Sequence, residues 1–343
     1  MRASAGSRVL MLLENNPYPQ DGRVRREAAS LSRAGYDVTV IAPAKKGQPK
    51  QDLVDGVRVC RYPAPKERDG FLGYALEYGY AMLAGWVLTL YVFVRFGFDV
   101  IHAHNPPDTY VAIAAPYKLF GKRFVFDHHD LSPEMYDARF MDGSNALVHR
   151  VLQWFEKLTF RFADRVISTN ESYKEIAIER GGVPSERIAV VRNGPDLDRV
   201  RAVAPDSALR AKAGTIIGYV GIMGYQDGVD YLIRALGHLV TDLRRNDVFC
   251  FIVGEGGAVP SLKALVAELG LGEHVWFTGR ISDEDLMRYL SAADICVDPD
   301  PFNPFNDRST MIKMSEYMAV GKPIVAFDLR EHRRTAADAA RFA

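Results

Sequence analysis

Short apolar runs alternate with helical stretches along most of the chain. The first series of apolar runs occupies residues 8–13, 37–42, 57–62, 99–104, 123–128, 165–170 and 187–193. Helical periodicity fills most of the intervals, as in residues 23–34 and 146–163. Continuous apolar strands separated by helices are typical of a parallel sheet that is covered on both faces.

A polar stretch at residues 195–214, rich in charge, Ala and Pro, interrupts this alternation. A second series of apolar runs follows at residues 215–221, 248–254, 274–279, 294–299 and 323–328. We therefore predict an α/β protein with two tandem, Rossmann-like, doubly wound parallel-sheet domains, residues 1–194 and 195–343. Because the chain stops soon after the last run, we expect the second domain to be C-terminally truncated.

Composition narrows the class of protein. Among 343 residues, 43 Lys and Arg balance 43 Asp and Glu, which argues against a nucleic-acid partner. The part up to residue 195 has 26 basic and 22 acidic residues and the rest 17 and 21, a small difference. Cys60, Cys250 and Cys296 are far apart in the sequence, which is typical of reduced core thiols in a cytoplasmic protein.

Residues 78–94 contain no charged side chain and are bounded by Glu77 and Arg95. A membrane-spanning helix needs about 20 such residues. We expect a buried helix of the first domain here, and the alternative is a helix that also presents an aromatic face to a bilayer surface.

Phosphate-binding signatures of the common nucleotide folds are missing from the sequence. The best candidate for a GxGxxG motif is GEGGAV at residues 254–259, where Val259 replaces the third glycine. No GxxxxGK[ST] motif is present. These patterns disfavour dinucleotide and P-loop chemistry.

Three loops at predicted strand ends carry the candidate chemistry. In the first, Asp21 and Gly22 precede a helix that we expect to begin near Arg23. The N–H groups of a helix start can hold an anion, and glycine allows close approach. The alternative is a plain capped helix, and we expect Arg23, Arg25 and Arg26 to be solvated.

The second loop follows the run at residues 123–128. It contains His128, His129, Asp130 and Glu134, and the preceding run ends in His102 and His104. If the two strands are adjacent and parallel, these groups would converge. Three interpretations stay open: histidines that tie loops together by hydrogen bonds, a metal site, and a general-base or sugar-positioning histidine. We favour the last.

The third loop lies between residues 298 and 327. Ser309 and Thr310 are cap-type residues, so we expect a helix to begin near Ser309. Lys313 and Glu316 would then share one face. Such a helix start suits a nucleotide diphosphate, with Glu316 accepting hydrogen bonds from sugar hydroxyls. The alternative is a capped helix with an internal Lys–Glu pair.

Taken together, these segments resemble family 4 of the retaining, GT-B-fold glycosyltransferases over essentially the whole chain. The resemblance is carried by PQDGRVRREAASLSRAGYDVTVIAP, DVIHAHNPPD, FDHHDLSPE, ADRVISTNESYKE, VVRNGPD, GYVGIMGYQDGVDYLIRAL, VWFTGR and STMIKMSEYMAVGKPIVA. It implies a nucleotide-sugar donor bound mainly by the second domain and an acceptor held by the first. It also implies retention of anomeric configuration, with no cofactor and no required metal ion.

The resemblance also assigns residues. Gly22 approaches the donor diphosphate, His129 contacts the transferred sugar, and Glu316 holds the donor ribose. The turn from Thr278 to Arg280 packs the nucleobase. We therefore expect His129 and Glu316 to be the catalytic residues. The expected substrate-binding residues are Gly22, Asp130, Glu134, Gly221, Gly224, Thr278, Arg280, Arg308, Ser309, Thr310 and Lys313.

Three positions depart from the family pattern. Arg308 stands where the family has the first Glu of its Glu–seven–Glu element, and Ile222 and Asp227 replace a basic pair. The donor diphosphate must then be neutralised by Lys313, Arg308, Arg280 or helix N-termini. The GxMGxxDG pattern resembles enzymes of exopolysaccharide or cell-envelope glycan assembly.

The resemblance implies an enzyme that moves a sugar from a UDP- or GDP-sugar to a glycan or lipid-linked acceptor. We expect it in the cytoplasm, peripherally on the inner face of the plasma membrane. Two alternatives stay open: a nucleotide-sugar epimerase of the same fold and a non-catalytic scaffold protein.

Overall fold

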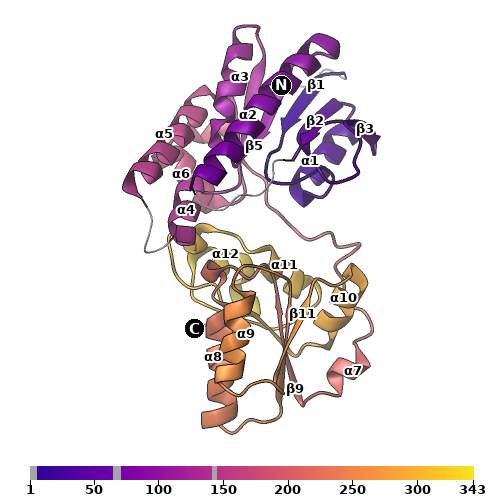
Figure 1. The fold of residues 1–343 in the computed structure, drawn as a ribbon, viewed down its shortest axis with the longest axis vertical. Helices are drawn as coiled ribbons and strands as arrows, with labels where there is room; N and C mark the ends of the chain where they lie inside the picture. The colour runs from indigo at the N-terminus through magenta and orange to yellow at the C-terminus, as the bar shows by residue number, and fades with distance from the viewer. Residues whose placement is uncertain (1–5, 65–70, 141–144) are drawn as a thin grey trace. The chain divides into compact units, whose positions relative to one another are not determined.

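The computed structural model describes residues 6–64, 71–140 and 145–343. The chain divides into two compact units, Met1–Arg192 (unit 1) and Asn193–Ala343 (unit 2). The division lies two residues before the boundary expected from the sequence. Each unit is an α/β domain with one sheet (Figure 1).

The sheet of unit 1 has eight strands in the order β3-β4-β2-β1-β5-β6-β7-β8. The strands are β1 (Arg8–Leu12), β2 (Asp37–Ala44), β3 (Gln51–Val54), β4 (Val57–Pro63), β5 (Val100–His104), β6 (Arg123–His128), β7 (Arg165–Ser168) and β8 (Ile188–Val190). Every pairing is parallel except that of β3 with β4. The sequence pattern predicted all but β3, whose four residues form a hairpin around Asp55 and Gly56, both at positive φ.

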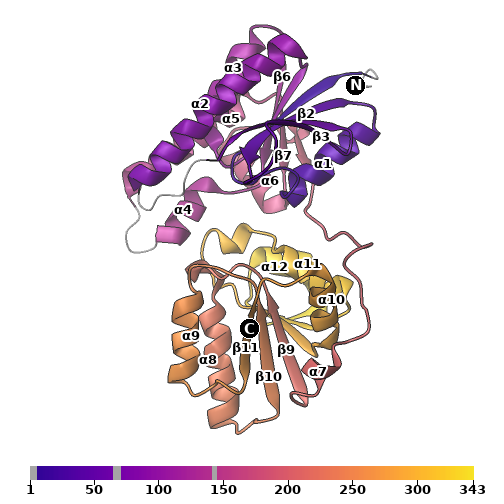
Figure 2. The same ribbon diagram turned by 45° about the vertical axis from the view of Figure 1, so that its right-hand side comes forward.

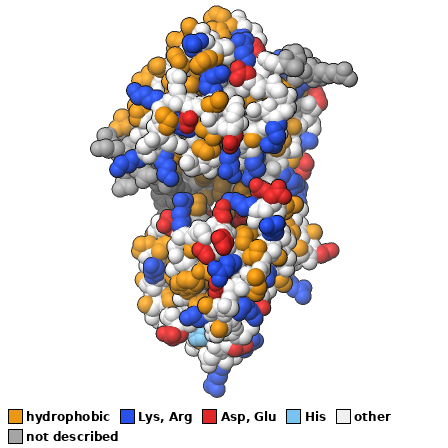
Figure 3. All heavy atoms as spheres, turned by 90° about the vertical axis from the view of Figure 1, so that its right-hand side faces the viewer, with side chains coloured by type: hydrophobic (Ala, Val, Ile, Leu, Met, Phe, Trp, Pro, Cys, Tyr) orange, Lys and Arg blue, Asp and Glu red, His pale blue; other side chains and the backbone are white. Residues whose placement is uncertain are grey.

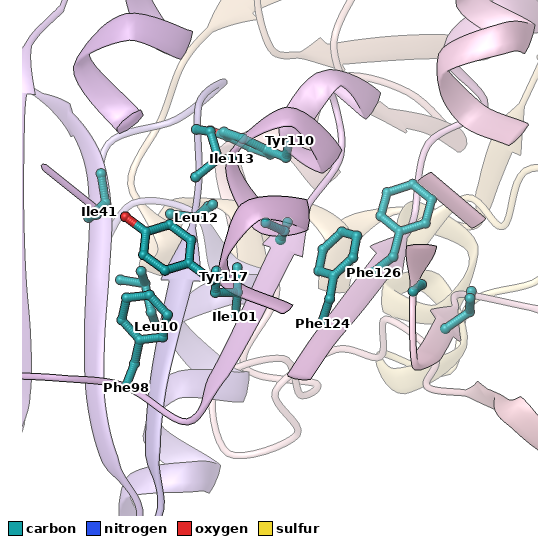
Figure 4. Close-up of a cluster of buried hydrophobic side chains, with 14 of the residues drawn as sticks. Leu10, Leu12, Ile41, Phe98, Ile101, Tyr110, Ile113, Tyr117, Phe124 and Phe126 are labelled. Atoms are coloured by element: carbon teal, nitrogen blue, oxygen red, sulfur yellow. The ribbon is translucent and has the colours of Figure 1, made fainter. Parts of the chain in front are cut away.

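Helices cover both faces of this sheet, as a doubly wound fold requires. They are α1 (Gly22–Arg33), α2 (Phe71–Arg95), α3 (Val111–Lys118), α4 (Ser132–Phe140), α5 (Ala146–Phe162) and α6 (Glu171–Glu179). Leu10 and Leu12 of β1 point into the core that α2, α3 and α5 share, where aromatic side chains gather (Figure 4). Val9 and Met11 point to the other face, under α1.

Helix α2 is less buried than the sequence pattern predicted. Ala81 and Val92 are buried against unit 1, but Leu83 and Val94 are 67% and 79% exposed. Within the described residues, the segment Leu76–Arg95 is long and apolar enough to cross a membrane, and 22% of its apolar window is buried. One such helix is weak evidence for a span, because core helices of soluble proteins pass the same test.

Unit 2 has a six-stranded, fully parallel sheet in the order β11-β10-β9-β12-β13-β14. Its strands are β9 (Thr215–Val220), β10 (Val248–Val253), β11 (Val275–Gly279), β12 (Ile295–Asp298), β13 (Ile324–Ala326) and β14 (Ala340–Phe342), the last not predicted. Its helices are α7 (Ser207–Arg210), α8 (Val229–Gly237), α9 (Val259–Glu268), α10 (Asp283–Ala292), α11 (Ile312–Ala319) and α12 (Arg330–Ala336). Figure 2 shows α8 and α9 on one side of the sheet and α10 and α11 on the other.

Both sheets reverse their strand order once, and this locates the candidate sites. In unit 1 the order reverses between β1 and β5, and in unit 2 between β9 and β12. Loops that leave the carboxyl ends of the strands diverge at such a point, which is where open α/β sheets bind ligands.

Two glycine-containing loops lock together at this edge of unit 2. The N–H of Gly221 donates to the Val253 carbonyl, and the N–H of Met223 donates to the Glu255 carbonyl. Gly254 has φ +131°, and a Cβ there would lie 1.9 Å from the Gly221 carbonyl oxygen. Only glycine fits this approach without a backbone shift.

We predict that Gly254→Ala destabilises unit 2 by roughly 2 kcal/mol or more, since it adds both backbone strain and a clash with backbone. Gly257→Ala is the matched control, because a Cβ there meets nothing within 4 Å. Urea unfolding of the two variants measures the difference, and equal midpoints would show that the two loops are not locked.

Candidate functional site

Arg23 and Asp127 form a buried ion pair at the carboxyl edge of unit 1. Arg23 lies in the first turn of α1 and Asp127 lies near the end of β6. Nε and one Nη donate to the two carboxylate oxygens at 3.0 and 2.9 Å. Arg23 is 7% exposed and Asp127 is fully buried. The expectation that Arg23 is solvated is therefore wrong, whereas Arg25 and Arg26 are exposed as expected.

Three histidines gather around the Asp127 carboxylate. Nε2 of His102 lies 3.5 Å from it, and Nδ1 of His104 and of His129 each lie 3.3 Å from it. Parallel pairing of β5 with β6 puts His104 opposite Asp127 in the sheet. The predicted convergence of these histidines is thus present, but it is centred on Asp127, which the sequence reading did not single out.

Asn105 fixes the backbone that carries His129. Its side-chain oxygen accepts hydrogen bonds from the N–H groups of His129 and Asp130 at 2.8 and 3.0 Å. Its amide nitrogen donates to the Asp130 carbonyl and to Asp108. Asn105 is buried, so the His129 ring is held in place from both its backbone and its Nδ1 side.

His128 and Glu134 belong to a different cluster. His128 lies 3.2 Å from Glu156, and Arg180 binds both Glu156 and Glu134. All four side chains lie away from solvent, with Glu134 8% exposed. Glu134 therefore meets Arg180 inside unit 1, and its predicted contact with substrate is not tested by this geometry.

Burial and neighbouring charge shift the pKa values of the groups around Asp127 in different directions. Burial, reinforced by Asp127, raises the pKa of Glu27 to about 7. Burial and the neighbouring His102 lower the pKa of His104 to about 3. Burial alone would lower the pKa of His129, but its hydrogen bond to Asp127 and the charge of that carboxylate raise it above the usual value.

Among the residues that the structure describes, two groups of side chains have donor atoms within 4.8 Å of one another, as metal ligands do. They are Glu27, His102, His104 and Asp127 in unit 1, and Asp298, Asp300 and His332 in unit 2. In each group a protein cation already binds the carboxylates: Arg23 lies 3.1 Å from Glu27 and 2.9 Å from Asp127, and Lys313 lies 3.0 Å from both aspartates. These cations supply the charge that a metal ion would bring.

Lys313 lies in the first turn of α11, which begins at Ile312 and not near Ser309 as predicted. The helix begins later because Ser309 Oγ donates back to the Phe305 carbonyl and Thr310 Oγ1 donates to Glu331. Lys313 and Glu316 are three residues apart within α11 and so stay on neighbouring positions of one face.

The Lys313 ammonium is largely neutralised inside unit 2. It contacts Asp298, Asp300 and, at 5.0 Å, the face of the Tyr219 ring. Burial next to Asp298 raises the pKa of Asp300 well above its usual range, while Lys313 holds the pKa of Asp298 low against the effect of burial. Lys313 is therefore held between the two buried carboxyl groups of Asp298 and Asp300, and it acts there as a fixed internal charge.

In the glycine loop after β9, the acidic residue Asp227 accepts a hydrogen bond from the loop itself. Asp227 Oδ2 accepts the Gly224 N–H at 2.7 Å, so this carboxylate folds back onto the loop. Ile222, which with Asp227 replaces the basic pair of the family pattern, is 72% exposed. With the Gly221 N–H bonded to Val253, the N–H groups of both predicted glycines already have partners in the protein.

Arg280 is the most exposed cation at this edge of unit 2 among those predicted to meet a diphosphate. Its side chain is 85% exposed, and Nε lies 3.7 Å from the carboxylate of Glu255, which is 67% exposed. Thr278 Oγ1 donates to the Gly279 carbonyl at 2.8 Å and fixes this turn. Arg308 lies in the short helix Asn306–Arg308 and is half-buried, as is Glu316.

In unit 1, α1 begins at Gly22 and is capped by Asp21, whose carboxylate accepts the Val24 N–H at 2.9 Å. Because the Asp21 carboxylate already accepts the Val24 N–H, an anion at this helix start would bind the N–H groups of Gly22 and Arg23. The negative charge of the cap also lowers the positive potential of the helix start. Sequence reading missed Asp127, Glu27 and Asn105. The one available signal was an acidic residue inside the apolar run RFVFDH.

We predict that Glu27→Gln removes a pH dependence of stability. Because the folded pKa is about 7 and the ordinary value 4.5, the folded state keeps a proton that the unfolded state releases. Stability therefore falls as pH rises through this window, by on the order of 3 kcal/mol from this group. Urea unfolding at about pH 5 and pH 8 measures the effect, with Glu179→Gln at the exposed end of α6 as control. Parallel pH profiles for wild type and Glu27→Gln would contradict the assignment.

Family models match both units. Residues 22–194 match the glycosyl transferase 4-like domain, and residues 214–340 match glycosyl transferases group 1. The chain is 25% identical to the 2-deoxystreptamine glucosyltransferase of Streptomyces kanamyceticus over 322 residues, covering 89% of this chain and 80% of that protein.

Solved structures agree on the fold. Sucrose-phosphate synthase from Thermosynechococcus elongatus superposes with a TM-score of 0.73 at 20% identity, covering 96% of this chain and 83% of that one. Anabaena Alr3699/HepE in complex with UDP and glucose gives a TM-score of 0.66 at 18% identity, covering 96% and 82%. The chain therefore belongs to the glycosyltransferases built from a glycosyl transferase 4-like domain and a group 1 domain, and it has the GT-B fold.

Proposed function

We propose that this glycosyltransferase moves a sugar from a UDP- or GDP-sugar to a glycan or lipid-linked acceptor, with retention of anomeric configuration, in cell-envelope or exopolysaccharide synthesis. The observation that carries the proposal is the set of fixed polar groups at the carboxyl edge of each sheet. The structure of a similar Anabaena protein with UDP and glucose supports a nucleotide-sugar donor.

Unit 2 contributes the donor nucleotide site in this proposal. Glu316 accepts hydrogen bonds from the ribose hydroxyls, and the turn from Thr278 to Arg280 packs the base. Since Asp298 and Asp300 neutralise Lys313, the exposed Arg280 and the start of α11 are better placed to stabilise the leaving diphosphate. In this proposal Arg280 and the helix start, and not a metal ion, meet the charge of the diphosphate.

Unit 1 contributes His129, which positions the transferred sugar. Its Nδ1 faces Asp127, so Nε2 is the nitrogen left for a sugar hydroxyl. The raised pKa of His129 favours the imidazolium, in which Nε2 carries a proton and donates. In the retaining mechanism the acceptor hydroxyl attacks from the face of the leaving group, and a donor phosphate oxygen takes its proton.

We predict that one of UDP, GDP or their sugar conjugates stabilises the chain in a thermal-shift experiment with a chelator present. A ligand at about 100 times its Kd adds ~2.7 kcal/mol. Glu316→Gln should weaken this binding at least about tenfold, the loss expected for a hydrogen bond to a charged group. Glu268→Gln, at the exposed end of α9, is the matched control.

Four results would reject parts of the proposal. No shift with any nucleotide would favour a non-catalytic scaffold, and a shift that needs a divalent cation would reject metal-independent donor binding. Release of UDP together with a free, epimerised sugar, with no acceptor present, would favour an epimerase. Unchanged affinity in Glu316→Gln would remove that residue from the donor site.

We predict a pH dependence that separates sugar binding from nucleotide binding. As pH rises through the raised pKa of His129, Nε2 loses its proton and can no longer donate. The affinity advantage of the nucleotide-sugar over the free nucleotide should therefore fall about tenfold as the pH rises from the ordinary histidine pKa to well above it. Calorimetric titration measures both affinities.

His129→Gln should abolish this pH dependence, and His238→Gln, an exposed histidine of unit 2, should keep it. A constant affinity ratio in the wild type, or an unchanged profile in His129→Gln, would show that His129 does not contact the sugar.

A further inference from the structure

Helix α2 exposes a continuous apolar stripe on the surface of unit 1. The stripe residues are all more than a third exposed: Leu76, Tyr80, Leu83, Trp86, Val87, Leu90, Tyr91 and Val94. Their spacing of three and four places them on one side of the helix. At 1.5 Å per residue the stripe is about 27 Å long.

The opposite side of α2 is packed against unit 1 through small or branched residues. Ala81, Thr89 and Val92 are buried, and a Cβ at Gly85 would lie 3.1 Å from the Ile113 side chain. The helix therefore approaches its neighbours closely on the inner side and carries its large side chains on the outer side. A core helix has the reverse distribution, so burial inside this unit does not account for the stripe.

The apolar surface continues beyond the C-terminal end of the stripe. The Phe120 ring lies 5.8 Å from that of Phe93 on α2, and both Phe120 and its neighbour Leu119 are exposed, Leu119 by 89%. We call the stripe together with Leu119 and Phe120 the α2 face. Its extent exceeds the scattered apolar residues that are normal on a monomeric surface.

Cations border the same end of the α2 face. The Arg58 and Arg95 guanidinium groups lie 4.2 and 5.3 Å from the Phe96 ring centre, and the Lys122 ammonium lies 5.9 Å from that of Phe93. Arg58 pairs with Asp37 and Lys122 with Asp99, while Arg95 has no ion pair within the described residues. In Figure 3, hydrophobic side chains gather along the upper left border of the view, with Lys and Arg side chains among them.

We propose that the α2 face docks on an anionic lipid bilayer, with α2 lying in the plane of the interface. Tyr80, Trp86 and Tyr91 combine an apolar ring with a polar tip, the residue chemistry that prefers the headgroup region. No charged residue interrupts the helix from residue 78 to residue 94. Arg95 and its neighbours at the end of the stripe match anionic headgroups.

Because its inner side is packed on unit 1, α2 docks without leaving the domain. If α2 docks in this way, unit 1 lies at the membrane surface that carries the proposed lipid-linked acceptor. Docking concerns unit 1 alone, so it stands or falls separately from nucleotide binding by unit 2.

Flotation of the full chain with vesicles tests the proposal. Vesicles of phosphatidylcholine with about 30% phosphatidylglycerol should carry the protein upward, and added salt should weaken binding because it screens charge. The double variant Leu83→Glu/Val94→Glu should bind at least tenfold more weakly. Leu243→Glu, at an apolar residue of unit 2 that is 56% exposed, is the control. Arg95→Gln should weaken binding about fivefold.

A positional readout separates α2 from any other surface. In Trp154→Phe/Trp276→Phe, Trp86 is the sole tryptophan, and brominated lipids should quench its fluorescence if α2 is inserted. Wild-type protein left at the bottom of the gradient with these anionic vesicles would overturn the proposal. So would unchanged binding of Leu83→Glu/Val94→Glu, or a soluble dimer that this variant dissociates while vesicles are not bound.

Discussion

The buried ion pair between Arg23 and Asp127 organises the candidate site of unit 1. It joins the first turn of α1 to the end of β6, two segments 104 residues apart in the sequence. Removing one partner of such a pair leaves an uncompensated buried charge, which costs about 3–5 kcal/mol. Asp127 also receives His102, His104 and His129, so the position of each ring depends on this one carboxylate.

Unit 2 has a comparable buried ion pair at the carboxyl edge of its sheet, formed by different residues. Lys313 enters from the start of α11 and meets Asp298 at the end of β12 and Asp300 just beyond it. Both pairs lie at the carboxyl edge of their sheet, near the point at which the strand order reverses and the loops diverge. A cation from a helix start bound to a carboxylate at a strand end fixes the edge in each unit, and the exposed groups around it are left for a ligand.

Local sequence patterns predicted the strands well because the central strands β1, β2, β9 and β10 are buried on both faces, which leaves a continuous apolar run in the sequence. The β3 hairpin was missed since Gln51–Val54 is short and half polar. The start of α11 was placed too early because Ser309 and Thr310 use their hydroxyls on Phe305 and Glu331, contacts that only the fold creates.

The same reasoning explains the errors at the candidate site. An arginine in a helix start is solvated by default, and Arg23 is buried only because Asp127 comes to it through the sheet. His102, His104 and His129 could be expected to converge, since β5 and β6 carry them to one edge. Their common partner could not be expected without the register of β5 against β6.

Helix α2 shows where a hydrophobic pattern stops being informative about burial. Its 25 residues span about 37 Å, whereas β4, seven residues long, spans about 23 Å. A sheet covers only one side of a helix that is packed on it, and a helix that is longer than the strands also extends past them. Uniform hydrophobicity therefore has two sources along α2: a close-packed inner side of small residues that belongs to the core of unit 1, and an outer side of large residues that no described element of unit 1 covers.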